Sequence, residues 1–218
     1  GFIRDGGMLL AWKTGTSAPA EAGFRVVVAH TDSPNLRIKP RASYGCEGYL
    51  QWGVEPYGGV LWHTWLDRDL GVSGRVAVRT ADGIRMHLVC INDVIARIPS
   101  LAIHLNRTVN SEGLKLNAQK HLAPVLGLGS GTEDRFRRRI AEELNCDADA
   151  ILDYELGFHT TEAPAIGGLD GAFIFSPRLD NQFCSYAALA ALAGAHSAPA
   201  TQVIALYDHE EVGSTSAR

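Results

Sequence analysis

Apolar runs at both ends of the chain predict buried strands. Met8–Trp12, Phe24–Ala29, Gly171–Phe175 and Val203–Leu206 are short and mostly apolar, and the second of these is also rich in β-branched residues. We therefore expect Phe24–Ala29 to be a central strand of a sheet that is covered on both faces. The alanine-rich stretch Phe183–Ala195 predicts a helix between the last two strands, and this β-α-β order favours a parallel sheet.

The middle of the chain has a different pattern. From about Ala42 to Ile98, short strand-like pieces alternate with glycines, and Asp82-Gly83 is a typical hairpin turn. These pieces are Tyr49–Val54, Gly59–Trp65, Gly74–Arg79 and Ile84–Ile91. Further on, a helix is expected from Thr132, with Phe136, Ile140 and Leu144 on one face, and Asp153–Phe158 is expected to be a strand. The middle therefore predicts an antiparallel, β-rich module.

Together these patterns predict an α/β fold, a mixed sheet with helices on both faces, interrupted by an inserted β-rich domain. We expect the first part of the α/β domain at residues 1–41, the inserted domain at 42–160 and the second part of the α/β domain at 161–218.

Composition narrows the function classes. The chain has 218 residues, of which 46% are hydrophobic and 20% charged, as in an ordinary soluble globular protein. A net charge of −4 gives no reason to expect nucleic acid as a partner. No apolar run approaches the roughly 18 residues that span a membrane. The four cysteines form no Cys-x-x-Cys pair, so neither a zinc ribbon nor a redox motif is indicated. Four dispersed thiols favour a reducing, cytoplasmic compartment, with disulfides as the alternative.

Polar residues with metal-binding chemistry follow three of the expected strands. They are His30 with Asp32, then Asp180, then Glu210 with Glu211. Ligand sites of open α/β sheets form at the carboxyl ends of strands, so these residues can converge. One imidazole and several carboxylates suit zinc or a similar divalent ion. Asp32 is placed to orient His30, and the two oxygens of Asp180 could bridge two ions.

Each of these residues also has a simpler interpretation. His30 could be a hydrogen-bonded histidine at a strand end, and Asp180 could be the N-cap of the following helix. Glu210–Glu211 could be two solvated acids on an exposed loop. The dipeptide that begins at His209 starts like a His-Glu-x-x-His zinc motif, but Gly213 stands where the second histidine is needed, which excludes that motif.

Five stretches identify a family. His30–Leu36, Ser176–Asn181 and Asp208–Ser214 resemble the three signature stretches of the aspartyl aminopeptidase family, and Gly58–Leu70 and Arg97–Leu105 resemble other segments of it. The resemblance covers nearly the whole chain, in order.

The resemblance implies a zinc exopeptidase fold with two zinc ions per subunit and an inserted dimerisation domain, assembled into a closed tetrahedral dodecamer. By the family pattern, His30 and Glu211 are metal ligands, Asp32 orients His30, and Asp180 bridges the two ions. The peptide bond between Asp180 and Asn181 is expected to be cis.

The same resemblance implies the reaction: removal of N-terminal Asp or Glu from peptides that have a free N-terminus. Glu210 would be the general base that activates the water. His104 would reach a neighbouring subunit's site and stabilise the oxyanion; the alternative is a histidine buried among Leu101, Ile103 and Leu105.

The family pattern extends beyond both ends of this chain. The usual N-terminal helix is missing, and the remaining Asp and His ligands are expected after Arg218. We therefore expect the chain alone to bind metal weakly and to be inactive. Two alternatives remain: a related dinuclear glutamyl or broad-specificity aminopeptidase, and a non-catalytic oligomerisation subunit.

Overall fold

The computed structural model describes residues 1–130 and 134–214 and divides the chain into two compact units. Unit 1 combines Gly1–Pro34 with Pro164–Arg218, and unit 2 is Asn35–Ala163. The boundaries thus differ from the expected positions after residues 41 and 160. The first boundary lies earlier because the strand Asn35–Cys46 belongs throughout its length to the sheet of unit 2.

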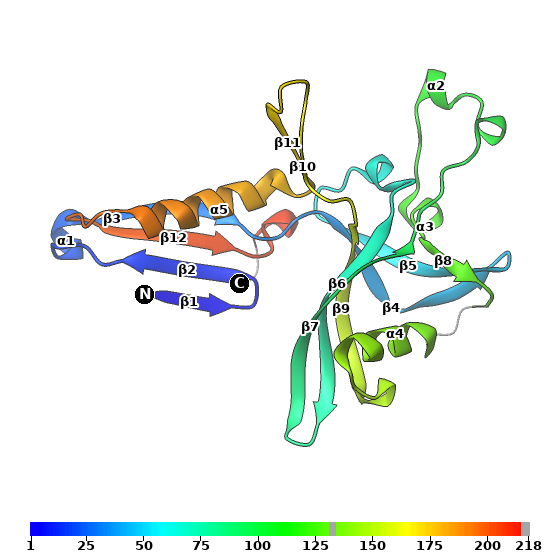
Figure 1. The fold of residues 1–218 in the computed structure, drawn as a ribbon, viewed down its shortest axis with the longest axis horizontal. Coiled ribbons are helices and arrows are strands. Elements are labelled where there is room, and N and C mark those ends of the chain that lie inside the picture. Colours follow the sequence, from blue (N-terminus) through cyan, green and yellow to red (C-terminus); the bar gives the residue numbers. More distant parts are fainter. Residues whose placement is uncertain (131–133, 215–218) are drawn as a thin grey trace. The chain divides into compact units, whose positions relative to one another are not determined.

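Unit 1 is built on a four-stranded sheet in the order β1-β2-β12-β3 (Figure 1). Strand β12 runs antiparallel to β2 and parallel to β3, so the sheet is mixed, and the predicted α/β class is confirmed. Its described elements are β1 (Phe2–Asp5), β2 (Met8–Lys13), α1 (Pro19–Ala22), β3 (Phe24–His30), β10 (Ala165–Gly167), β11 (Phe173–Phe175), α5 (Leu179–Gly194), β12 (Thr201–Tyr207) and the 3-10 turn η4 (Glu210–Val212).

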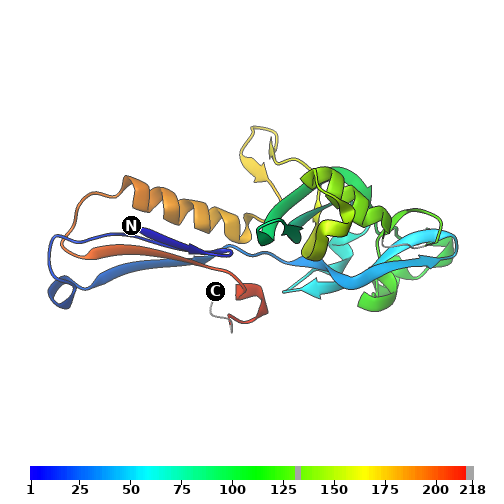
Figure 2. The ribbon, with the colours of Figure 1, turned by 90° about the horizontal axis from the view of Figure 1, so that it is seen from below.

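Small side chains let α5 approach this sheet closely. The helix lies on one face of the sheet and contacts β3 and β12 (Figure 2). The buried cluster at this contact contains Ala29, Ala188, Ile204 and Leu206, together with Ala11 of β2. Among the described helices of the chain, none combines the length and the hydropathy that crossing a bilayer requires.

The position of β3 differs from the expectation. It lies at the edge of the four-stranded sheet, paired only with β12 in the described part of the chain, and Phe24–Val28 are exposed. The prediction of a central, doubly covered strand is therefore wrong. An apolar, β-branched run favours a strand, but it does not specify how many neighbouring strands it has.

The predicted β-α-β unit around α5 is also wrong. Strand β11 pairs antiparallel with β10 in a separate two-stranded sheet, whereas the parallel partner of β12 is β3. The parallel relation therefore joins strands that are far apart in sequence, which a local pattern cannot reveal.

Unit 2 contains a six-stranded sheet in the order β7-β6-β9-β4-β5-β8, with antiparallel neighbours. The pair Thr80–Gly83 closes the β6–β7 hairpin, as the turn signal predicted. Gly59–Trp65, expected to be a strand, instead includes a 3-10 turn. The described elements are β4 (Asn35–Cys46), β5 (Tyr49–Tyr57), η1 (Trp62–Trp65), β6 (Leu70–Thr80), β7 (Gly83–Ala96), η2 (Ile103–Leu105), α2 (Val109–Glu112), α3 (Ala118–His121), β8 (Val125–Leu128), α4 (Asp134–Leu144), η3 (Ala148–Ala150) and β9 (Ile151–Thr160).

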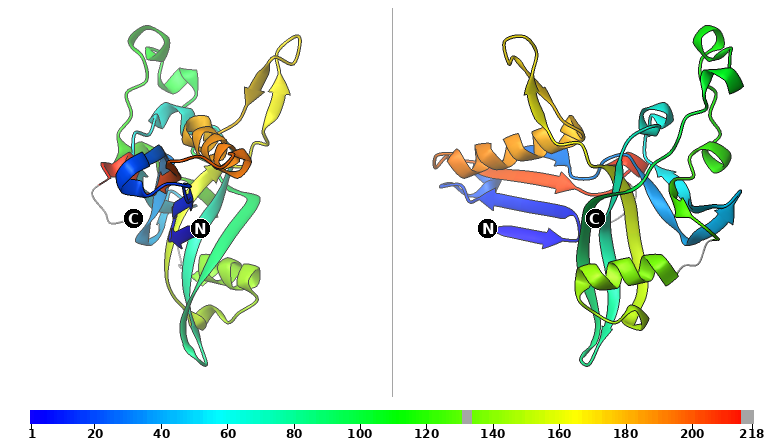
Figure 3. Two further views of the ribbon diagram at one scale, coloured as in Figure 1. Left: turned by 90° about the vertical axis from the view of Figure 1, so that its left-hand side faces the viewer. Right: turned by 45° about the vertical axis from the view of Figure 1, so that its right-hand side comes forward.

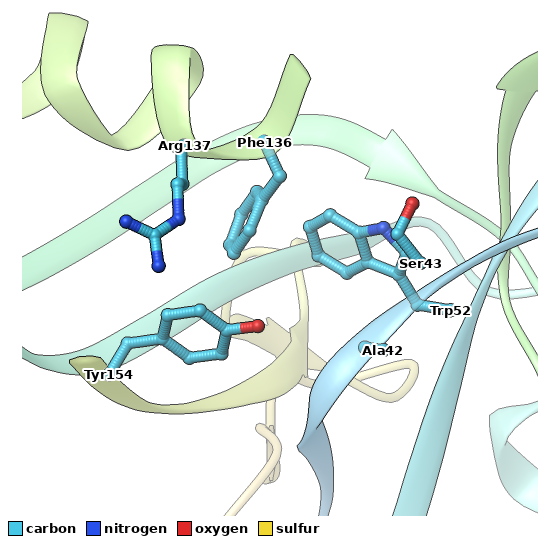
Figure 4. A pocket seen from close by; sticks show the side chains of 6 residues that line it. All are labelled: Ala42, Ser43, Trp52, Phe136, Arg137 and Tyr154. Atoms are coloured by element: carbon cyan, nitrogen blue, oxygen red, sulfur yellow. The ribbon is translucent and has the colours of Figure 1, made fainter. Parts of the chain in front are cut away.

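The core of unit 2 includes an aromatic contact between its sheet and α4. The rings of Trp52 and Phe136 meet edge to face, with centroids 3.9 Å apart (Figure 4). Phe136 and Ile140 are buried and Leu144 packs against them, which confirms the predicted apolar face of this helix. The expected helix start at Thr132 lies outside the described residues.

Candidate metal centre

Two parallel strands bring the first polar cluster and the last together. Tyr207 of β12 lies beside His30 of β3 in the register, so both strands end at the same edge of the sheet. The Thr31 N–H donates to the Tyr207 carbonyl at 2.8 Å and extends the ladder by one residue. The residues that follow β3 and those that follow β12 are therefore held side by side.

The Asp32 side chain ties these two strand ends together. One carboxylate oxygen accepts the Glu210 N–H at 3.2 Å and the other accepts the Glu211 N–H at 3.1 Å. Only 6% of the Asp32 side chain is exposed, so water has little access to compete for these hydrogen bonds. Asp32 therefore fixes the backbone from which both glutamates project.

Asp32 also orients the imidazole of His30. The Nδ1 atom of His30 lies 3.0 Å from the Asp32 main-chain oxygen and 3.3 Å from a carboxylate oxygen. With acceptors on that side, the neutral ring carries its proton on Nδ1, and the lone pair of Nε2 is directed away from Asp32. This is the arrangement that metal-binding histidines use.

Carboxylates surround the other side of the ring. The Nε2 atom of His30 lies 3.5 Å from an oxygen of Asp180 and 3.8 Å from an oxygen of Glu210. One ligand atom from each of His30, Glu210 and Glu211 lies within 4.8 Å of the other two. One nitrogen and several oxygens at these separations fit zinc or a similar divalent cation.

Asp180 does not cap α5. The N-cap position is Arg178, with φ of 60°, and no side chain caps the helix. The backbone at Asp180 and Asn181 is non-helical and the peptide bond between them is cis, as the family resemblance implied. The N-cap interpretation is therefore wrong, and 93% of the Asp180 side chain is exposed beside the histidine.

Two further side chains of α5 join the helix to the end of β3. The Ser185 hydroxyl donates to the His30 carbonyl at 2.8 Å, and the side-chain amide of Gln182 donates to the Thr31 carbonyl at 2.6 Å. These hydrogen bonds hold the beginning of α5, and with it Asp180, against the strand that bears His30. Sequence reasoning did not identify them, because they join residues more than 150 positions apart.

The turn between β1 and β2 contacts the loops that follow β3 and β12. The Thr31 hydroxyl donates to the Gly7 carbonyl at 2.8 Å. A Cβ atom on Gly7 would lie 2.4 Å from a carboxylate oxygen of Asp208, so any larger residue at this position would displace the Asp208 side chain. The consecutive glycines at 6 and 7 were a signal for a tight turn, but their contact with the strand-end loop was missed.

His104 belongs to unit 2 and lies in η2. It is exposed, and so are Leu101, Ile103 and Leu105 around it in sequence, so the interpretation as a buried histidine is wrong. The expected role at a neighbouring subunit's site remains a prediction.

The fold and the site define a class. A histidine and acidic side chains converge where adjacent parallel strands of a mixed sheet end, and the histidine is oriented by a buried carboxylate. This is the architecture of an α/β protein with a divalent-metal centre.

Comparison with known proteins identifies the family. The model of the aminopeptidase I zinc metalloprotease (M18) family matches residues 2–218, and the chain belongs to this family. It is 44% identical, over 99% of its length, to the "Probable M18 family aminopeptidase 2" of Streptomyces avermitilis, and 46% identical, over 98%, to the protein of that name in Pseudomonas entomophila.

Solved structures agree with this assignment. Chaetomium thermophilum mApe1 shares 33% identity with a TM-score of 0.88, covering 98% of this chain and 52% of that one. The S. cerevisiae mApe1 dodecamer shares 29% identity with a TM-score of 0.80, covering 98% and 50%. The chain spans about half the length of the curated relatives it matches.

Proposed function

We propose that the longer protein to which this chain corresponds is a zinc-dependent aminopeptidase that removes N-terminal Asp or Glu from peptides. The observation that supports this most directly is the cluster of His30, Glu210 and Glu211, with Asp180 against the same imidazole. Membership of a zinc metalloprotease family supplies the metal and the reaction class.

In this proposal three side chains hold the metals. Nε2 of His30 would hold one ion, Glu211 would hold the other, and Asp180 would be shared between them. Two zinc ions at this position would lower the pKa of water and polarise the scissile carbonyl. Asp32 is a positioning residue, because it acts through the His30 ring and the backbone of both glutamates.

Glu210 is proposed as the general base. It takes a proton from the attacking water and passes it to the leaving amine. About half of its side chain (53%) is exposed, so water and substrate can reach the carboxylate, while Asp32 fixes its backbone.

The two adjacent glutamates form a matched pair for a test. We expect Glu210→Gln in the full-length protein to keep its zinc and lose turnover, and Glu211→Gln to lose zinc as well as turnover. Zinc content by atomic absorption and hydrolysis of an aspartyl anilide separate the two effects. Full activity of Glu210→Gln would refute the role of Glu210 as general base. If Glu210→Gln lost zinc and Glu211→Gln kept it, Glu210 would be the metal ligand and Glu211 the base.

For the chain of 218 residues alone, we propose weak metal binding and no activity. Its proposed ligands supply two protein groups per ion, His30 with Asp180 and Glu211 with Asp180, whereas catalytic zinc sites keep three. Zinc titration of this chain and of the full-length protein tests the difference. Equal affinity and turnover in both would overturn the proposal.

The acidic specificity needs its own test, because membership of the family gives the reaction class and not the N-terminal residue that is removed. Rates on Asp-, Glu-, Leu- and Lys-anilides separate an aspartyl enzyme from a glutamyl or broad-specificity one. A preference for the Leu substrate would exclude the aspartyl assignment while leaving the aminopeptidase proposal intact. If the full-length protein has neither zinc nor activity, the non-catalytic subunit is the better description.

We also propose self-association through unit 2 into a dodecamer, on the basis of the related mApe1 dodecamer. His104 would then stabilise the oxyanion in a neighbouring subunit. A complementation experiment tests this: His104→Ala and Glu210→Gln are each expected to be inactive, and mixed assemblies of both are expected to regain part of the activity. No recovery would exclude action between subunits.

We propose a cytoplasmic location for the protein. All four cysteines are free thiols in the structure, and three of them are exposed, which suits a reducing compartment.

A further inference from the structure

Three residues other than glycine have a positive φ in the described part of unit 1, and all three flank the candidate metal centre. His209 has a φ of 64°, Arg178 a φ of 60° and Ser214 a φ of 50°. Arg178 stands two positions before Asp180, and His209 immediately precedes Glu210. A left-handed backbone is unfavourable for L-residues, and where the surrounding structure holds it, it often marks a functional site. Among these three residues, His209 is directly joined to the glutamate pair.

The left-handed backbone of His209 begins a loop that follows β12 and includes η4 (red in Figure 3). Carboxylates accept the first three N–H groups of this loop. The His209 N–H donates to an Asp208 oxygen at 2.9 Å, and those of Glu210 and Glu211 donate to the two oxygens of Asp32. A left-handed residue followed by helical ones turns successive N–H groups to one side, where they bind an anion. In this loop the anion is the Asp32 carboxylate.

Main-chain carbonyls accept the next three N–H groups of the loop. The His209 carbonyl accepts the N–H of Val212 at 3.4 Å and that of Ser214 at 3.0 Å, and the Glu210 carbonyl accepts the Gly213 N–H at 2.9 Å. Each N–H group from residue 209 to residue 214 therefore has an acceptor. The His209 carbonyl and the Glu210 N–H belong to one planar peptide group. A different backbone conformation at His209 would turn both of them away from their partners.

Asp208 holds the beginning of this loop in place. Only 20% of its side chain is exposed, and one carboxylate oxygen accepts the His209 N–H. The other oxygen lies so close to Gly7 that a Cβ atom there would be 2.4 Å away. The Gly7 carbonyl in turn accepts the Thr31 hydroxyl at 2.8 Å. The left-handed conformation is therefore held from both ends, by Asp208 before it and by Asp32 after it.

We propose that His209 is a positioning residue: its left-handed backbone directs Glu210 and Glu211 toward the candidate metal centre. The inference rests on the proposed function for the roles of the two glutamates, and it adds the residue that orients them. A left-handed position accepts Gly without strain, and Asn, Asp and His are the other residues found there most often. Ala is less favourable, and a β-branched residue such as Val is the least favourable. Replacement by Gly, Asn, Ala and Val therefore varies the backbone preference at this position.

Four variants of the full-length protein measure the effect on kcat and on zinc affinity. We expect His209→Asn and His209→Gly to keep both within about threefold of the unmodified protein. His209→Ala should lose about 5- to 30-fold in both, which is the fold-change that the cost of a left-handed residue corresponds to, and His209→Val at least as much. The substrate is the anilide that the unmodified protein cleaves fastest, and competition with a chelator gives the zinc affinity.

Two results with these variants would overturn the proposal. A loss in His209→Asn equal to that in His209→Ala would assign the effect to the imidazole rather than to the backbone. Full activity and full zinc affinity of His209→Val would show that the left-handed conformation is not needed.

Glu47→Val in unit 2 is the matched control. Glu47 also has a positive φ, of 50°, and is exposed in the turn between β4 and β5. Val introduces the same β-branched strain there, outside the candidate site, so urea unfolding should show a loss of stability while kcat and zinc affinity stay unchanged. If Glu47→Val lost as much activity as His209→Val, general destabilisation would explain both losses and the proposal would be overturned. If His209→Val does not fold, the comparison of His209→Ala with His209→Asn decides.

Amide hydrogen exchange by mass spectrometry tests the loop without relying on zinc or activity. We expect the amides of residues 209–214 to be protected in the unmodified full-length protein, and to exchange faster in His209→Ala but not in His209→Asn. Rapid exchange in the unmodified protein would overturn the inference. Absence of zinc and of peptidase activity from the unmodified protein would instead overturn the proposed function and leave the loop geometry intact.

Discussion

Removal of the Asp32 carboxylate tests the central geometry of the site. This side chain accepts hydrogen bonds from the backbone of Glu210 and Glu211 and lies beside Nδ1 of His30. The change Asp32→Ala leaves two N–H groups without their acceptor in a place where the carboxylate was only 6% exposed. It also removes the group that fixes the tautomer of His30.

The expected magnitudes follow from these contacts. Loss of a buried hydrogen-bond partner costs about 1–3 kcal/mol per group, so two groups correspond to roughly 2–6 kcal/mol in the free energy of unfolding. Loss of the group that orients a metal-binding histidine weakens metal binding about 10–100-fold. Asp32→Asn keeps one acceptor oxygen but turns an NH₂ group toward the other N–H. It should therefore fall between the alanine variant and the unmodified protein.

Competition of the full-length protein with a zinc chelator measures the affinity, and urea unfolding measures the stability. Asp82→Ala is the control, because that aspartate is exposed at the β6–β7 hairpin: it should leave the zinc affinity unchanged, and loss of its exposed ion pair with Arg85 should cost no more than about 1 kcal/mol. If Asp32→Ala binds zinc within twofold of the unmodified protein and loses less than about 1 kcal/mol of stability, the coupling of Asp32 to the site is refuted.

Three further predictions concern unit 2. Burial raises the pKa of Glu155, but hydrogen bonds and charges from Arg75 and Arg37 lower it more, so its folded pKa is below the usual value. The stability that these contacts contribute is fully present above the unfolded-state pKa of Glu155, and it is lost as pH falls through the folded-state pKa. In urea unfolding between pH 7 and pH 3, Glu155→Gln should therefore lose less stability on acidification than the unmodified protein. Trp52→Ala should cost about 3–5 kcal/mol in urea unfolding, because it empties the contact between the sheet and α4; a cost below about 1 kcal/mol would contradict this packing. Burial raises the pKa of the Cys146 thiol, so mass spectrometry should show iodoacetamide modifying it more slowly than the three exposed cysteines; equal rates would contradict the burial.

The sequence located most of the candidate site because the chemistry lies at strand ends. His30 and Glu210 each follow a run that could be recognised by its apolar character, and carboxyl ends of strands are where α/β sheets place ligands. The structure brings these residues together with Asp180. The contacts that hold them were not predictable, since the hydrogen bond from the Glu210 N–H to Asp32 joins residues 178 positions apart.

The sequence by itself determined where several of the strands, turns and helices form, because side-chain periodicity and turn residues act over a few positions. It predicted the β6–β7 turn and the buried face of α4, and it placed the candidate metal-binding residues at the ends of strands. Only the tertiary structure decided which strands are neighbours. Strand β3 became an edge and the parallel partner of β12, and the Gly7 turn came to lie behind Asp208. Strand pairing depends on packing between distant segments, and an apolar run fits an edge as readily as a centre.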